Sequence, residues 1–459
     1  MRRRNFSLLW SGQSISQLGG QLSIFALPTI AILVLHANAA QVGALQSLEF
    51  SVVAVLAIFV GVIVDRFKRR PLMLAANLVR ILSVGSLPLA FAVHRLSLGQ
   101  FFVCAAITAA ANVVFDTAFG AFVPSLLGRE EFGKGNAKMT MSASAAEAIG
   151  NSSSGVIVQF VGAPLALALN CFAYVFSSFS LFKLRVEEHI EPTVSEENAV
   201  RRFVNEFVDG LNLVWKKREL RAIALTSSTA YFSGSMVTAV FALYAYRTLH
   251  MSPLTFGVLM GFGNLGLLGG IVAKPLASRM GPRTTLAFAT TLSGVAKLVF
   301  LIAPFPFLSI LAGRLLLSLT GPIYSIVDQE IRVLCVDDNM MGRMNATMRT
   351  LIWGALPLGA LAGGSFAQFA GIHTTMLAGG LIGVVSSIWL LLCPPIRSYA
   401  RIPSRLGTST AWRKNPRRHL AAIRFLTASY VRPKINRRSR ASRSTSSPLS
   451  NKRSKATAA

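Results

Sequence analysis

Hydrophobic residues along the chain fall into twelve long blocks, separated by short polar segments. Each block holds roughly 20 residues or more, the length that a helix needs to cross a hydrocarbon layer about 30 Å thick. Alternation of apolar and polar positions at strand spacing is absent, so a membrane β-barrel does not fit. We therefore predict an all-α membrane protein with transmembrane helices near residues 6–35, 41–64, 72–93, 98–123, 139–161, 164–184, 221–246, 254–275, 284–303, 305–327, 345–369 and 372–393.

The composition agrees with lipid as the main solvent. Of the 459 residues, 53% are hydrophobic and 14% are charged, whereas a soluble globular chain has about 25% charged residues. The four cysteines stand singly in the apolar blocks, without a Cys-x-x-Cys pair or a histidine cluster. We expect them to be small buried residues and predict no metal site, no disulfide and no cofactor.

Basic residues gather in alternate connections between the blocks. Odd-to-even connections such as 36–40 hold almost no Lys or Arg, whereas even-to-odd segments such as 66–70, 129–138 and 279–283 are basic. Positive charge on one set of connections marks the cytoplasmic side of a membrane. The pattern predicts an even number of spans, with both termini in the cytoplasm of a bacterial cell whose inner membrane holds the chain.

The longest internal connection is charged and amphipathic. Four apolar residues recur on it at helical spacing, namely Phe203, Phe207, Leu211 and Trp215. We predict a cytoplasmic helix that lies on the membrane surface and joins two six-helix bundles; a plain tether would give the same topology and stays open as an alternative. The predicted N-terminal bundle, linker, C-terminal bundle and tail are residues 1–185, 186–220, 221–395 and 396–459.

The two halves of the chain resemble each other. The segment Asn136-Ala-Lys-Met139 recurs as Asn345-Ala-Thr-Met348, and this offset of 209 also matches glycines at 150, 155 and 162 with glycines at 359, 364 and 371. Span five therefore corresponds to span eleven. Six plus six spans in parallel repeat are typical of transporters that rock two halves about a central site.

The last segment of the chain is strongly basic. Of the 46 Lys and Arg residues, 17 follow Cys393, and no Asp or Glu follows Asp338. Low hydrophobicity and high charge predict a disordered tail that is attracted to anionic lipid at the cytoplasmic surface. Because the formal net charge of +28 is partly a property of this tail, we do not expect a nucleic-acid partner.

Three sequence segments resemble a known family. Gly61-Val-Ile-Val-Asp65-Arg-Phe-Lys-Arg-Arg70-Pro71, after span two, resembles the loop signature of the major facilitator superfamily. The opening Phe6-Ser-Leu-Leu-Trp10 and the segment Phe122-Val-Pro124 resemble the branch that contains macrolide-efflux proteins and the enterobactin exporter. The resemblance implies two pseudo-symmetric six-helix bundles and transport by alternating access, and the sequence has no nucleotide-binding loop, metal-ligand spacing or nucleophile set that would suggest an enzyme.

The resemblance also implies a conformational latch at that loop. A carboxylate at Asp65 would meet the positive N-terminal end of span eleven, near Gly342 and Arg343, and so hold the outward-facing state. The arginines of the loop would pair with an acid on span four, or they would only enforce topology. The predicted latch residues are Gly61, Asp65, Arg66, Arg69, Arg70, Asp116 and Arg343.

Two acidic residues inside spans are candidates for proton coupling. Ionisable groups in a membrane span are costly and are functional candidates by default. Glu147 lies near the middle of span five, a depth that suits a carboxyl group for loading and releasing a proton, and Glu49 lies closer to the outer side of span two. A buried pair with Arg or Lys of a neighbouring helix is the alternative for both residues.

Neutral polar residues are candidates for the substrate cavity. Gln13, Gln17 and Gln21 follow one another at intervals of four on one face of span one, and the resemblance places spans one, four, seven and ten around the cavity. Tyr231 of span seven and Tyr324 of span ten would add aromatic rings. The glutamine stripe is equally compatible with helix packing through amide hydrogen bonds.

These observations favour proton-driven export of a bulky amphipathic compound, such as a drug or a siderophore-like metabolite, by a monomer. Two alternatives stay open, namely uptake of a small metabolite and a non-transporting sensor with a transporter fold.

Overall fold

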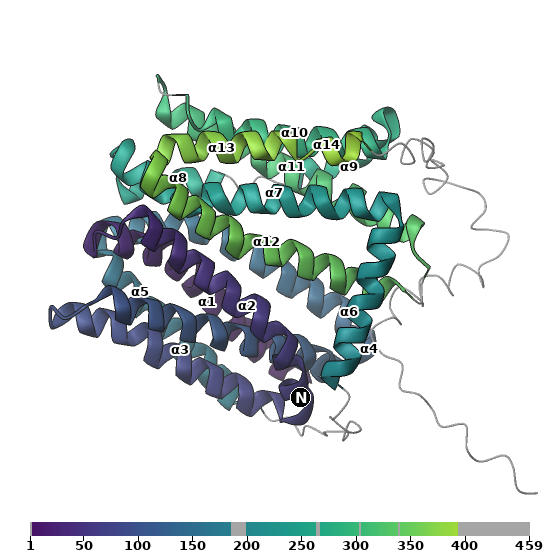
Figure 1. Cartoon of the computed structure of the whole chain (residues 1–459). Helices are drawn as coiled ribbons and strands as arrows, with labels where there is room; N and C mark the ends of the chain where they lie inside the picture. Colours follow the sequence, from purple (N-terminus) through teal and green to yellow (C-terminus); the bar gives the residue numbers. More distant parts are fainter. Residues whose placement is uncertain (1, 185–198, 263–266, 303, 338–339, 393–459) are drawn as a thin grey trace, which may run out of the picture. The chain divides into compact units, whose positions relative to one another are not determined.

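The computed structural model describes residues 2–184, 199–262, 267–302, 304–337 and 340–392 (Figure 1). All of them lie in the compact unit Met1–Ile402, and they contain helices without a β-strand. The predicted tail and the first part of the predicted linker lie outside the described residues.

The N-terminal half contains six spans in five continuous helices. These are α1 (Arg2–Thr29), which the π-helical turn η1 (Ile30–Val34) extends, α2 (Ala39–Arg66), α3 (Arg69–Ala92), α4 (Leu98–Val161) and α5 (Ala163–Phe182). Helix α4 holds both span four and span five, with a kink between them at Gly128. The φ of Gly128 is +73°, a backbone conformation that glycine adopts without a Cβ penalty. The basic connection predicted at 129–138 is itself helical, because the helix resumes directly after Gly128.

The C-terminal half repeats this order. Its helices are α7 (Arg218–Leu243) with the π-turn η3 (Tyr244–Thr248), α8 (Pro253–Phe262), α9 (Leu267–Met280), α10 (Pro282–Val299), α11 (Pro306–Cys335), α12 (Met341–Ala370), α13 (Ile372–Val385) and α14 (Ile388–Leu391). Span eight comprises α8 and α9, and span twelve comprises α13 and α14, which completes the twelve spans. The hydropathy pattern predicted that the tenth span ends near residue 327, whereas helix α11 continues to Cys335.

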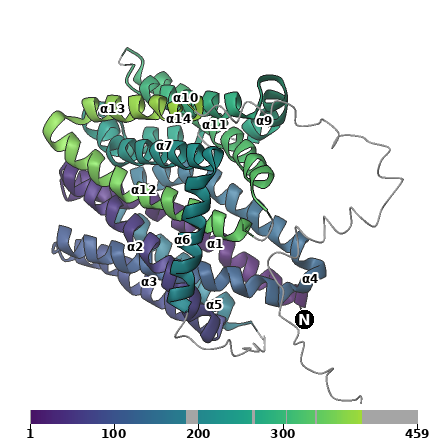
Figure 2. The same ribbon diagram turned by 45° about the vertical axis from the view of Figure 1, so that its right-hand side comes forward.

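The predicted linker helix is α6 (Ala199–Lys216). Figures 1 and 2 show that it runs crosswise to α7 and α12.

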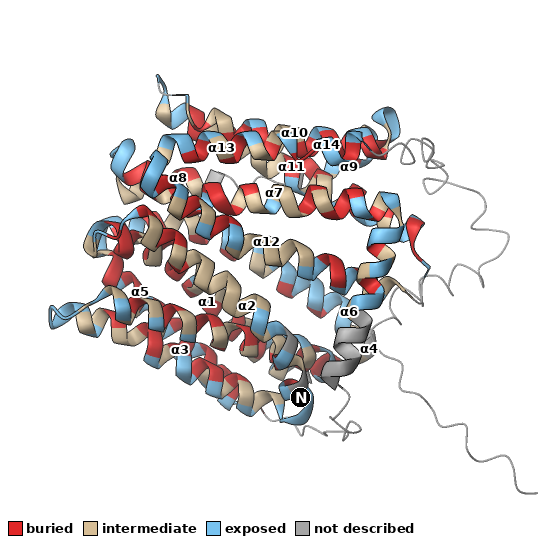
Figure 3. Cartoon of the chain, viewed as in Figure 1, coloured by how far each residue is buried: buried red, intermediate tan, exposed pale blue. Residues whose placement is uncertain are grey.

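The spans have the surfaces expected of helices in lipid. Eight described helices are long and apolar enough to cross a membrane. Figure 3 shows buried residues along one side of helices such as α3 and exposed residues along the other. Large apolar side chains are exposed on the outer faces, for example Leu89 and Phe172, each 70% exposed. In water such a surface would cause aggregation, whereas lipid solvates it.

The halves repeat each other in detail. Arg70 donates from Nε to Leu181 O (2.9 Å) and from Nη2 to Phe182 O (2.6 Å), so it caps the last carbonyl groups of α5. Arg283 donates to Leu390 O (2.7 Å) and Leu391 O in the same way. A cation at a helix C-terminus satisfies carbonyl groups that lack helical partners.

A second repeat lies where spans one and seven end. Each ends in a π-helical turn followed by a Leu-His pair, Leu35-His36 and Leu249-His250, in which the histidine has a φ of +50°. The next helix then begins at a side-chain cap, Asn38 or Ser252.

The two halves meet at one end, which we call the closed end: residues 29–43, 150–161, 244–257 and 360–370. Here a Cβ on Gly43 would lie 2.5 Å from Cα of Gly364, and a Cβ on Gly155 would lie 2.6 Å from Cα of Gly257. The backbones of α2 and α12, and of α4 and α8, therefore cross in direct contact, which only glycine permits. The two crossings are pseudo-symmetric equivalents.

Aromatic rings fill the space between the halves at the closed end. Phe256 of α8 lies 5.6 Å from Phe25 of α1, 5.8 Å from Phe241 and 5.3 Å from Tyr246, measured between ring centroids. All four are buried and belong to a single hydrophobic cluster that spans both halves. Such rings exclude water from this end.

The opposite end, which we call the linker end, is where α2 ends at Arg66 and α12 begins at Met341. A 28-residue helix is about 42 Å long, so α2 runs from the closed end to the linker end. A Cβ on Gly61 of α2, or on Gly342 or Gly354 of α12, would meet no atom within 4 Å. The close crossing of these two helices is therefore confined to the closed end.

Candidate functional site

Glu147 and Arg314 bring opposite charges together from the two halves. Glu147 lies in the second part of α4 and is exposed. Its carboxylate acts electrostatically on the guanidinium of Arg314 in α11, which also donates from Nη2 to Met260 O (3.2 Å). The Nε atom of Arg314 is buried without a hydrogen-bond acceptor among the described residues. Arg314 thus gives Glu147 a cationic neighbour, as the charge-pair alternative requires, but Glu147 is exposed rather than buried. Its role in proton coupling stays a prediction, and Arg314 was not among the predicted site residues.

Glu49 has different surroundings. It is half-buried on α2, and no hydrogen bond or ion pair of its side chain is found within the described part of the chain. Its role in proton coupling stays a prediction.

The glutamine stripe on α1 contains unsatisfied acceptors. The Oε1 atoms of Gln13 and Gln17 are buried without a hydrogen-bond donor among the described residues. Gln21 instead packs against the backbone of Gly150, where an added Cβ would lie 2.6 Å from its side chain. Packing therefore accounts for Gln21, whereas the other two amides have oxygens that a water or a substrate donor could satisfy.

The two predicted cavity tyrosines differ. Tyr231 of α7 is 46% exposed, so its ring is accessible. Tyr324 of α11 forms a hydrogen bond with Ser227 of α7, with 2.6 Å between the two hydroxyl oxygens. This bond joins two helices of the same half.

The predicted latch residues have separate partners in the structure. Asp65 and Arg66 are exposed at the end of α2, and Arg69 donates from Nη1 to Ala121 O of α4 (3.1 Å). Asp116 interacts electrostatically with Arg80 of α3. The guanidinium of Arg80 stacks on Phe115, 4.3 Å from the ring centroid.

Arg343, the expected counterpart of Asp65, has another partner in this structure. Its Nη1 donates to Asp209 Oδ2 of the linker helix α6 (3.1 Å). A contact between Asp65 and Arg343 is therefore not formed in the state described, and the latch stays a prediction for another state.

Polar contacts between the halves at the closed end were not foreseen from the sequence. Thr29 donates to Phe25 O (2.8 Å), so the hydroxyl of Tyr246 supplies the proton of the 2.9 Å bond between Tyr246 and Thr29. Arg247 donates from Nη2 to Ala37 O (2.9 Å). The repeated Leu-His pair and the matched glycines at 155 and 364 are sequence signals that mark this region in both halves.

A buried amine lies inside the C-terminal half. Lys297 of α10 is 5% exposed and donates from Nζ to Ser233 Oγ (2.9 Å), and Ser233 donates to Gly379 O of α13 (2.7 Å). In the part of the chain that the structure describes, no group of three or more His, Cys, Asp or Glu residues could hold a metal ion.

Comparison with solved structures agrees with this architecture. A nucleoside transporter, NupG, is 12% identical with a TM-score of 0.65, covering 84% of this chain and 98% of that one. A bacterial homologue of the iron transporter ferroportin, in an inward-facing state, is 17% identical with a TM-score of 0.62 and the same coverage.

A family model and sequence relatives identify the family. The multidrug efflux pump Tap of Mycobacterium tuberculosis is 26% identical over 398 residues, which cover 84% of this chain and 92% of Tap. Macrolide efflux protein A of Streptococcus pyogenes is 20% identical over 402 residues, covering 86% and 97%. The family described as transmembrane secretion effector matches residues 1–412. With twelve spans in two repeated bundles and a match over most of its length, the chain is a multi-pass membrane transporter rather than an enzyme, and it belongs to the transmembrane secretion effector family of the major facilitator superfamily.

Proposed function

We propose that the protein exports a bulky amphipathic small molecule by alternating access, driven by protons that flow inward. The observation that carries the proposal is how the two halves meet. Helices of the two halves cross in direct contact at the closed end. Away from these crossings, Glu147 of one half is exposed and interacts with Arg314 of the other half. A transporter that rocks about a central site passes through such a state. The efflux functions of Tap and of macrolide efflux protein A support export as the direction.

The same proposal includes an orientation. Basic residues cluster at the linker end, for example at 66–70, and the positive-inside pattern assigns that end to the cytoplasm. The closed end then faces outward, so the state described is inward-facing. We place the chain in a bacterial inner membrane as a monomer with both termini in the cytoplasm, and single-cysteine labelling of intact cells at His94 and at Lys68 tests this orientation: only the former should react.

Glu147 is the proposed proton carrier. An ionised carboxylate attracts the guanidinium of Arg314 across the boundary between the halves, and protonation removes this attraction. Because Glu147 is exposed, a proton can reach it in the state described. Proton loading would therefore weaken one link between the halves at the point where they must move.

The substrate class is argued from the candidate cavity residues. Tyr231 offers an accessible aromatic face, and the amide oxygens of Gln13 and Gln17 can accept hydrogen bonds. A few polar groups in an otherwise apolar lining suit an amphipathic molecule.

The proposal is tested with inverted membrane vesicles that contain the protein. Uptake of radiolabelled erythromycin and of ethidium is measured with an imposed pH gradient, acid inside, and after nigericin collapses that gradient. We expect gradient-driven accumulation that Glu147→Gln reduces at least tenfold, whereas Glu219→Gln, a control in the first turn of α7, leaves it unchanged. Full activity of E147Q excludes the assigned carrier; movement only in the opposite direction favours uptake, and no movement of any amphipathic probe favours a sensor.

A further inference from the structure

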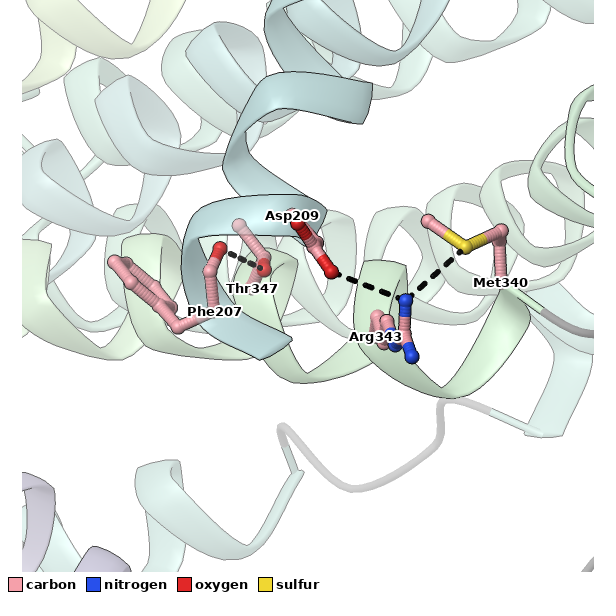
Figure 4. Close-up of polar contacts among 5 residues, drawn as sticks. All are labelled: Phe207, Asp209, Met340, Arg343 and Thr347. Carbon is pink, nitrogen blue, oxygen red and sulfur yellow. Dashed lines mark hydrogen bonds and ion pairs between the residues drawn. The ribbon is translucent and has the colours of Figure 1, made fainter. Parts of the chain in front are cut away.

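The linker helix α6 packs on the C-terminal half, against α12 and α7. Gly210 permits this contact, because a Cβ at that position would lie 2.7 Å from Arg343 O. Thr347 of α12 donates from Oγ1 to Phe207 O of α6 (3.3 Å), as Figure 4 shows. The helix is thus fixed to the first turns of α12 by backbone packing and by a hydrogen bond.

An ion pair lies at the edge of this contact. Asp209 Oδ2 accepts a hydrogen bond from Arg343 Nη1 at 3.1 Å, and Arg343 also lies 3.7 Å from the sulfur of Met340 (Figure 4). The side chains of Arg343 and Asp209 are 41% and 52% exposed. An exposed pair of this kind is easily broken, so it can exchange partners.

The start of α12 is where the sequence predicted that Asp65 would dock. The first turn of α12 has no acidic residue, and its N-cap residue Met340 makes no side-chain cap. Its N–H groups and positive dipole end therefore attract a carboxylate. Apart from Asp337 and Asp338, which precede α12 in the chain, two acids from other elements could approach this region: Asp209 from the linker and Asp65 from the N-terminal half.

We propose that α6 is a conformational switch in which Asp209 competes with Asp65 for Arg343. While the halves are apart at the linker end, Asp209 holds Arg343. When that end closes, Asp65 approaches the start of α12 and takes Arg343 over, and the hand-over sets the balance between the two states. The inference rests on the alternating access proposed above, and it adds a role for the linker beyond joining the halves.

The switch is tested by distance measurement between spin labels. Labels at Lys68→Cys and Leu334→Cys, two exposed positions near the linker end, report its opening in purified full-length protein from which the native cysteines have been replaced by serine. Asp209→Asn should increase the population in which the linker end is closed by up to about fivefold. This is the effect of losing an exposed ion pair of about 1 kcal/mol. Asp337→Asn, another exposed acid near α12, is the matched control and should have no effect.

A charge exchange separates a switch from a merely structural contact. In the double variant Asp209→Arg, Arg343→Asp, the linker pair forms again with reversed signs, but Asp65 now faces a like charge. We expect the population in which the linker end is open to exceed that of the wild type, and the state in which the linker end is closed to be lost. Wild-type distances in this double variant, or no change in D209N, would overturn the switch. The two spin labels could instead show a single distance that stays the same in Glu147→Gln and after addition of erythromycin. That result would contradict alternating access itself.

Discussion

Arg80, Lys297 and Arg314 place cations inside the helical bundles, and each has a different kind of partner. Arg80 stacks on an aromatic ring, Lys297 donates to a neutral hydroxyl group, and Arg314 interacts with the carboxylate of Glu147. Charges at membrane depth are costly unless such partners are present. The contact that crosses from one half to the other, between Arg314 and Glu147, is the one that a rocking motion would change.

The pair Ser233 and Lys297 yields a prediction about stability. Ser233→Ala removes the acceptor of a buried amine, and leaving such a group unsatisfied costs about 1–3 kcal/mol. The same substitution should cost less in a Lys297→Met background, because the methionine side chain needs no acceptor. Thermal unfolding of the four purified proteins in detergent measures the coupling.

Thr238→Ala serves as the control for this cycle. Thr238 is exposed on the same helix and, among the described residues, its hydroxyl group bonds to Gly234 O alone, in the preceding turn. Its loss should therefore shift the unfolding midpoint little. Equal destabilisation by S233A in both backgrounds would show that the amine does not depend on this hydroxyl group.

At the scale of helices, paired glycines determine how the halves fit together. Gly43 faces Gly364 and Gly155 faces Gly257, and the two crossings are related by the internal repeat. Helices that approach this closely gain dispersion contacts along both backbones. Both crossings lie at the closed end, so they act only in states in which that end is closed.

Gly364→Ala should therefore disfavour the closed end selectively. The added methyl group would lie 2.6 Å from Cα of Gly43, which is too short, so α2 and α12 must separate. We expect faster modification of a cysteine placed at Ala40 near this crossing and a loss of transport of several-fold. Gly354→Ala on the same helix is the matched control, because its methyl group would meet no atom within 4 Å; equal effects of both variants would contradict the role of the crossing.

At the scale of the whole molecule, the closed end combines close packing, aromatic rings and a few polar links between the halves. The bond from Tyr246 to Thr29 and the bond from Arg247 to Ala37 O both join the C-terminal half to the N-terminal half. These links can exist only while that end is closed. They therefore bias the equilibrium between the two states without touching the proposed substrate region.

Tyr246→Phe should shift that equilibrium by a predictable amount. The variant keeps the ring in the aromatic cluster and removes one buried hydrogen bond, worth about 1 kcal/mol, or roughly a fivefold change in the population ratio. Distances between spin labels at the closed end measure the shift toward opening. Tyr244→Phe, which loses a bond to Phe300 O within one half, should leave the ratio unchanged, and a shift of the same size there would refute the assignment.

Much of the fold could be predicted from the chain because its signals are local. Block lengths and alternating basic connections predicted twelve spans, and the structure confirms this architecture. The exceptions were also local in origin. Gly128 makes so tight a kink that no loop is needed between spans four and five. Helix α11 continues beyond its apolar block, where Asp328 and Arg332 form an ion pair (2.7 Å).

The candidate site was less predictable. Glu147 was selected because an acid in mid-span is unusual, yet its neighbour Arg314 lies 167 positions further along the chain. The bonds from Arg70 to the last carbonyl groups of α5 were not foreseen, and its role in a latch stays a prediction. The partner of Arg343 could not be inferred either, because Asp209 lies on a helix whose docking position no local pattern encodes.

The sequence by itself determined which segments enter the membrane and that the two halves are repeats, because hydropathy, helix period and loop charge act over neighbouring residues. Tertiary structure alone decided which helices cross, which charges meet and at which end the halves are joined. Those outcomes depend on how whole helices rotate and pack, and on which of two states of similar free energy the bundles adopt. No short stretch of sequence specifies that choice.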